Sequence, residues 1–181
     1  MASKIKVDTL ETANGSGTIA LSNQLSGMTT ASLPALGSAQ MPSGSVLQVQ
    51  YMYSGLAISS TSQTYSDTGI NVSITPTSTS SKILVFAHIG GTYKSANVNA
   101  YMALQIVRGS TPIHIFEGQG GYNATNQPNG FGTEAGVKLD SPATNSAINY
   151  KIQIKNLGGV GTVYANQSGA LSSITLMEIQ G

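Results

Sequence analysis

The chain has 181 residues, of which 40% are hydrophobic and only 8% are charged, with a formal net charge of +1. An average globular protein carries roughly 25% charged residues, so solubility must rest here on Ser, Thr, Asn, Gln and 21 glycines. The length fits one domain with an extension. The absence of cysteine excludes disulfides, thiolate chemistry and cysteine-based zinc sites, and the eight Lys and Arg form no basic cluster for nucleic acid.

Residues 1–45 differ in composition from the rest of the chain. They contain no aromatic side chain, whereas all eleven aromatic residues lie between Tyr51 and Tyr164. Large aromatic side chains supply much of the apolar area that offsets the entropy cost of ordering a small fold. The sequence therefore predicts an N-terminal arm and linker over residues 1–45, which a partner must order, and one folded domain over residues 46–181.

The arm carries a β-hairpin signal, because two short runs of alternating apolar residues flank the turn sequence Asn14-Gly15. An isolated hairpin is marginally stable in water. We therefore expect the arm to pair with copies of itself or with a foreign sheet. Its candidate anchoring residues are Ile5, Val7, Leu10, Ile19 and Leu21.

Alternating apolar and polar residues after position 45 indicate β-strands. The clearest run is 148–155, which is typical of a strand with one wet face. The run beginning at Leu47 repeats the pattern, with Val49 and Tyr51 on one side and Gln48 and Gln50 on the wet side. Nearly continuous apolar runs indicate strands covered on both faces, by a second sheet or by a neighbouring subunit; these are residues 82–89, 101–107 and 174–179.

Turn signals separate these runs at Asp67-Thr68-Gly69, at Arg108 to Thr111 and at Leu157 to Gly161. They leave about eight strands and no convincing helix. The sequence therefore predicts an all-β domain, an antiparallel two-sheet sandwich or jelly roll, with a barrel as the structural alternative.

One long Gly- and Asn-rich segment, Gly118 to Gly136, interrupts the pattern of short turns. Loops of this length without secondary structure are often functional, so this segment is the candidate recognition loop. Its aromatic residues could stack on a sugar ring or could pin the loop to its own domain, and a crossover without a binding role is the other interpretation. The candidate recognition residues are Tyr122, Asn123, Asn126, Asn129 and Phe131.

The sequence contains no pattern typical of catalysis. The two histidines, His88 and His114, fall inside apolar runs, where core or interface positions are commoner than metal ligation. No paired carboxylates, nucleophile elbow or phosphate loop is present. No signal peptide is evident, and the longest apolar stretch is far below the roughly 18 residues that a membrane span needs. We expect no enzyme, cofactor or metal, and no nucleic-acid partner or membrane insertion.

Two stretches, Ile5 to Pro34 and Ser66 to Val85, resemble small structural proteins of tailed bacteriophages, especially those that infect marine bacteria and cyanobacteria. Such proteins are tail-fibre, head-fibre or capsid-decoration components. The resemblance implies that the C-terminal part is a trimeric jelly roll of the tumour-necrosis-factor or C1q shape.

Two functional hypotheses follow from the resemblance. The first is a non-enzymatic homotrimer on the virion surface, made in the cytoplasm of the host bacterium. In this hypothesis the arm docks on the major capsid protein or another virion protein, and the apolar strand Tyr101 to Val107 lines the threefold contact. The alternative is a receptor-binding protein of a tail fibre or short fibre, whose loop 118–136 recognises host surface glycan.

Overall fold

The computed structural model describes residues 37, 40–123 and 126–181. The chain divides into a unit Met1–Leu36 and a unit Gly37–Gly181, and every described strand belongs to the second unit. The predicted anchoring residues Ile5, Val7, Leu10, Ile19 and Leu21 lie outside the described residues. In the described ranges, no helix has the length and apolarity required to cross a membrane.

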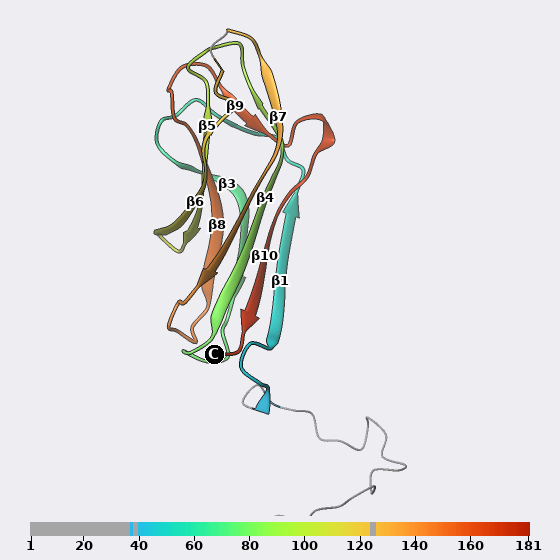
Figure 1. Ribbon diagram of the computed structural model, residues 1–181, viewed down its shortest axis with the longest axis vertical. Coiled ribbons are helices and arrows are strands. Elements are labelled where there is room, and N and C mark those ends of the chain that lie inside the picture. The colour runs from blue at the N-terminus through green and yellow to red at the C-terminus, as the bar shows by residue number, and fades with distance from the viewer. Residues whose placement is uncertain (1–36, 38–39, 124–125) are drawn as a thin grey trace, which may run out of the picture. The chain divides into compact units, whose positions relative to one another are not determined.

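The prediction of an all-β domain is confirmed (Figure 1). Two of the strands, β2 and β9, have only three residues each, which is why the sequence pattern indicated fewer. A 3-10 turn, η3 (Gln167–Gly169), precedes the last strand. The described strands are β1 (Val46–Ser54), β2 (Ile58–Ser60), β3 (Ser66–Ile74), β4 (Lys82–Lys94), β5 (Met102–Arg108), β6 (Thr111–Gly120), β7 (Asn129–Asp140), β8 (Ile148–Asn156), β9 (Val163–Ala165) and β10 (Ser172–Ile179).

The strands form two antiparallel sheets, as predicted. Sheet A has the order β1-β10-β4-β9-β2, and β7 also pairs with β4. Sheet B has the order β3-β8-β5-β6. Figure 1 shows β1, β10 and β4 side by side along the long axis of the domain.

The core lies between the two sheets and is filled mainly by β-branched and Leu side chains. The alternation predicted for residues 148–155 is confirmed, since Tyr150, Ile152 and Ile154 of β8 are buried. Each fully buried side chain of this size contributes about 1.5 to 3 kcal/mol of transfer free energy. The core residues of sheet A opposite them are Ile83, Val85, Ala87, Ile89, Ile174 and Leu176.

A charged cluster joins the two sheets beside this core. Arg108 of β5 donates to both carboxylate oxygens of Asp140 on β7, over 3.0 and 2.9 Å. The hydroxyl of Tyr150 on β8 donates to the same carboxylate over 2.7 Å. Sheet B therefore supplies both donors and sheet A supplies the acceptor.

Two sequence predictions about turns need correction. Asp67-Thr68-Gly69 lies inside β3, where the pairing register with β8 shifts and Gly69 adopts φ +83°, so the segment is a β-bulge instead of a turn between strands. The Gly-rich segment 118–136 is mostly strand, because β6 extends to Gly120 and β7 begins at Asn129. Only residues 121–128 connect the two strands.

Candidate interaction face

The outer surface of sheet A carries three rows of side chains, each crossing β1, β10, β4 and β7. The pairing register sets these rows, since Tyr51 lies opposite Thr175, Thr175 opposite Phe86, and Phe86 opposite Val137. We call these twelve positions the sheet A face. Its rows are Val49, Met177, Leu84 and Leu139; Tyr51, Thr175, Phe86 and Val137; and Tyr53, Ser173, His88 and Ala135.

The sheet A face is mostly apolar, because nine of its twelve positions are hydrophobic and only Ser173, Thr175 and His88 are polar, and it is open to solvent in the single chain. Tyr51 is 58% exposed and Val137 is 54% exposed, and Tyr51 stacks on Tyr53 with ring centroids 5.8 Å apart. None of its twelve positions carries Asp, Glu, Lys or Arg. Four strands about 4.8 Å apart and three rows about 6.7 Å apart cover roughly 400 Å², a size at which exposed apolar patches are often functional.

The orientation of β1 differs from the sequence prediction. The predicted wet side carries Gln48 and Gln50, but these residues are partly buried and the tyrosines face outward. The cause is Glu178 of β10, which is buried and needs donors. Gln48 Nε2 donates to Glu178 Oε2 over 2.6 Å and to the carbonyl of Thr75 over 2.8 Å. The glutamines therefore face inward to satisfy a buried carboxylate.

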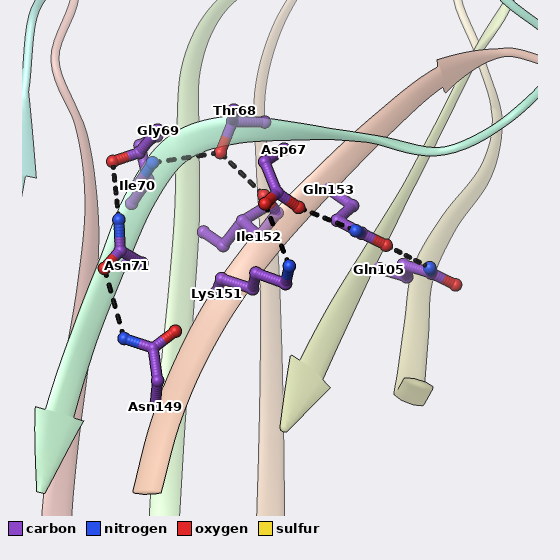
Figure 2. A network of polar contacts seen from close by, with 10 residues as sticks. All are labelled: Asp67, Thr68, Gly69, Ile70, Asn71, Gln105, Asn149, Lys151, Ile152 and Gln153. Carbon is purple, nitrogen blue, oxygen red and sulfur yellow. Dashed lines mark hydrogen bonds and ion pairs between the residues drawn. The ribbon is translucent and has the colours of Figure 1, made fainter. Parts of the chain in front are cut away.

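The outer surface of sheet B carries a network of polar contacts, which Figure 2 shows. Asp67 accepts hydrogen bonds from Lys151 over 2.8 Å and from Gln153 over 2.7 Å. These two donors hold the pKa of the Asp67 carboxyl below its usual range. Gln105 donates to Gln153 over 2.7 Å, which extends the network onto the next strand. This surface suits contact with water.

The same network continues along β3 and β8. Asn149 donates to Asn71 over 3.1 Å and to Ser73 over 3.2 Å. Beyond it, the Lys155 ammonium lies 4.5 Å from the centroid of the Tyr65 ring, at cation–π distance. The two outer surfaces of the sandwich therefore differ. The side chains on the outer surface of sheet B are polar and hydrogen-bonded to one another, whereas the sheet A face exposes mostly apolar side chains.

The strand predicted to line a contact between subunits does not do so. Residues Met102 to Val107 of β5 are buried on both faces within the single chain. Their coverage on both faces was predicted correctly, but no apolar surface remains there for a neighbour. Sequence reasoning assigned the contact to the most hydrophobic strand, whereas the exposed apolar surface lies on sheet A.

The candidate recognition residues divide between a connecting segment and a strand. Tyr122 is 60% exposed and meets Tyr101 edge to face, with ring centroids 5.6 Å apart. Asn126 Oδ1 accepts a hydrogen bond from the backbone of Val98 over 2.9 Å. Asn129 and Phe131 belong to β7, and Phe131 packs against the core. Phe131 therefore holds the base of the segment to its own domain.

Lys94 is a buried residue near this segment that sequence reasoning missed. Its ammonium donates to the carbonyl of Asn97 over 2.7 Å and to Asn123 Oδ1 over 2.9 Å. Burial lowers the pKa of Lys94 below its ordinary value. Lys94 therefore ties two connections to the end of β4, the β4–β5 connection at Asn97 and the 121–128 connection at Asn123. Only its position in an alternating strand could have indicated burial.

Within the described ranges there is no pocket and no group of three His, Cys, Asp or Glu that could hold a metal ion. His88 lies on the sheet A face, and His114 stacks on Phe116 with ring centroids 6.5 Å apart. No protein-family model matches the chain, and no curated protein matches it. The sheet A face is therefore the strongest candidate site on physical grounds.

Proposed function

We propose that the chain is a non-enzymatic structural protein of a bacteriophage particle and acts as a homotrimer whose copies meet through the sheet A face. The observation that carries this proposal is the difference between the two outer surfaces of the sandwich. The outer surface of sheet B carries polar side chains that are hydrogen-bonded to one another, whereas sheet A exposes Tyr51, Phe86 and Val137 without a polar partner among the described residues. A face of this composition is stabilised when another apolar surface covers it.

The magnitudes suit a face at the centre of a larger contact. At about 25 cal/mol per Å², covering roughly 400 Å², of which three positions in twelve are polar, contributes less than about 10 kcal/mol. Association costs about 4 to 15 kcal/mol in lost translational and rotational freedom. The face therefore forms the centre of an interface, and flanking residues such as Val46 and Ile179 add its rim. Because the face carries no carboxylate or ammonium group, two copies approach without repulsion between like charges.

The order of the strands supports a jelly roll of the tumour-necrosis-factor or C1q shape. Leaving aside the two three-residue strands, the first strand of the chain pairs with the last, β1 with β10, and the second pairs with the second from last, β3 with β8. The inner pairs follow the same rule, β4 with β7 and β5 with β6. A long antiparallel hairpin rolled into two sheets produces this nested pairing, which is the plan of a jelly roll.

In this proposal the arm, residues 1–45, anchors the trimer on the virion surface by docking on the major capsid protein or another virion protein. Its composition supports the assignment, because it lacks aromatic residues and carries strand-like alternation at Ile5 and Val7. Strand addition to a foreign sheet edge supplies backbone hydrogen bonds. Three arms on one trimer multiply a weak contact through effective concentration.

Deletion of residues 2–42 tests the anchoring part of the proposal. Particles lacking the native protein are incubated with the deleted and the full-length chain, and occupancy is measured after sedimentation. We expect the deleted chain to keep its oligomeric state and lose occupancy. Undiminished occupancy would show that the arm is not the anchor, and a full-length chain that does not bind particles at all would contradict the virion assignment.

The alternative function is a tail-fibre or short-fibre protein that recognises host glycan. The observation that favours it is the exposure of Tyr122 on a segment that Lys94 and Asn126 hold in place. Competition for host adsorption separates the two functions. Purified fibre protein blocks infection, and Tyr122→Ala removes the block, whereas a decoration protein leaves adsorption unchanged.

A further inference from the structure

His88 lies on the middle of the sheet A face. It belongs to β4, which runs between β10 and β7, and it sits opposite Ser173 on one side and Ala135 on the other. The residue is exposed in the single chain, and it makes no hydrogen bond or ion pair with any residue in the described ranges. Water therefore supplies the hydrogen bonds of this imidazole as long as no other surface covers the face.

The sheet A face offers His88 neutral hydrogen-bonding groups but no counterion. The hydroxyl groups of Tyr51, Tyr53, Ser173 and Thr175 belong to the same face. A neutral imidazole has one donor and one acceptor, which suits hydroxyl partners, whereas an imidazolium has two donors and a positive charge. None of the twelve positions carries Asp or Glu. When two copies of this face meet, neither copy supplies a carboxylate to an imidazolium.

The acidic residues on the strands of sheet A do not share the outward side with His88. Glu134 of β7 lies opposite Ile89, so alternation places it on the other side of the sheet. Asp140 is paired in the cluster between the sheets, and Glu178 is buried among its own donors. Besides His88, the titratable groups on β4 and on the elements that contact it in the sheet are Lys82, Tyr93 and Lys94 on β4, Glu134, Lys138 and Asp140 on β7, Tyr164 on β9 and Glu178 on β10.

The charged group that does share the outward side of β4 has the wrong sign to help. Lys82 is exposed and lies six residues before His88 on the same strand. At about 3.3 Å per residue, the two side chains are roughly 20 Å apart. A second positive charge near the edge of the face does not stabilise an imidazolium at its centre.

We propose that His88 makes association through the sheet A face sensitive to pH. The copies associate while the imidazole is neutral and separate when it is protonated, because a covered imidazolium on this face has neither water nor a carboxylate partner. This inference rests on the proposed function, since it requires that copies of the chain meet through this face. It adds a regulation of that contact by protons.

The direction of the pH effect follows from proton uptake. Histidine is the side chain whose charge ordinarily changes between about pH 5 and about pH 8. Covering the face removes water from the imidazole and disfavours its charged form. The separated chain therefore binds more protons than the assembled one, so falling pH favours separation. With one proton and about tenfold per copy, the association constant of a trimer should fall by up to about a thousandfold per pH unit.

Sedimentation equilibrium of the full chain at about pH 8 and about pH 5.5 tests the inference. We expect trimers at the higher pH and a shift toward folded monomers at the lower pH, with circular dichroism to show that the fold is kept. A chain that is monomeric at both pH values would contradict the proposed self-association, and this inference with it. A chain that forms trimers with the same association constant at both would overturn the role of His88 and leave the proposed function standing.

Variants of the two histidines make the test specific. His88→Gln keeps a donor and an acceptor, His88→Phe keeps an apolar ring, and neither variant takes up a proton, so both should remain trimeric at the lower pH. His114→Gln is the matched control, because His114 lies on β6 in sheet B and stacks on Phe116. This variant should lose trimers as the wild type does. Loss of trimers in the His88 variants at the lower pH, or none in His114→Gln, would contradict the assignment to His88.

Discussion

Thr77 donates two hydrogen bonds to one carboxylate oxygen of Glu178, from its backbone N–H and from its hydroxyl, each over 2.7 Å. The hydroxyl of Ser81 donates to the same oxygen over 2.7 Å, and Gln48 donates to the other. Glu178 is fully buried. Neutral donors from β1 and from the connection between β3 and β4 therefore hold this charge, and the carboxylate joins three parts of the chain.

Replacing Glu178 with Gln should destabilise the domain by about 2 to 3 kcal/mol, because an amide nitrogen would replace an oxygen that accepts bonds from buried donors. Urea unfolding at neutral pH measures the change. Asp67→Asn, on an exposed network, should cost less than about 1 kcal/mol. An equal loss of unfolding free energy in the two variants would show that the buried carboxylate of Glu178 contributes no more to stability than the exposed one of Asp67.

The pH dependence of stability should carry the signature of Glu178. Burial alone would raise the pKa of this carboxyl, but the hydrogen bonds from Ser81, Gln48 and Thr77 lower it below its ordinary value. A lowered folded-state pKa means that the contribution is present above the unfolded pKa and is lost as pH falls through the folded value. Thermal unfolding between about pH 6 and about pH 3 should show a drop that Glu178→Gln flattens. An unchanged slope in the variant would contradict this role.

Substitutions in the cluster of Arg108, Asp140 and Tyr150 between the two sheets should lower the free energy of unfolding by different amounts. Asp140→Ala leaves Arg108 and the Tyr150 hydroxyl without their acceptor, so we expect a loss of about 2 to 4 kcal/mol. Tyr150→Phe removes only one donor and should cost about 1 kcal/mol. Denaturant unfolding of both variants measures the difference. A Tyr150→Phe loss as large as that of Asp140→Ala would contradict the central role of the carboxylate.

Lys94→Met should change the connecting segments more than the core. Methionine fills a similar volume without a buried charge, so global stability should change by less than about 1 kcal/mol. The hydrogen bonds to Asn97 and Asn123 are lost, so amides in the segments around these residues should exchange faster. Hydrogen exchange resolved by peptide measures this, with β8 as the internal reference. Faster exchange throughout the domain would mean that Lys94 supports the core itself.

Sequence periodicity predicted correctly which side of a strand is buried where the hydrophobic side of that strand packs in the core of the same chain. The alternation over 148–155 matches the burial of β8. In β1 the same alternation predicted which residues share a side of the strand, but it did not predict which of the two sides faces the core. That choice depends on Glu178, which is distant in sequence and accepts from Gln48. Periodicity cannot report a partner that only the tertiary fold brings near.

The Gly-rich segment shows a second limit of sequence reasoning. Glycines at 118–136 indicated a loop, yet Gly136 lies within β7. A Cβ atom at this position would lie 2.5 Å from the Phe116 side chain of β6, so the position requires glycine. This glycine therefore allows two strands to approach each other closely and does not form a turn. No motif in the sequence announces this approach.

The native mass of the full chain and of Phe86→Glu tests the role of the sheet A face most directly. A glutamate at the centre of the face places a charge in the interface, so wild type should be trimeric and the variant monomeric and folded. Ser73→Glu on the outer surface of sheet B is the matched control and should remain trimeric. A monomeric wild type, or a Phe86→Glu variant that stays trimeric, would contradict self-assembly through this face.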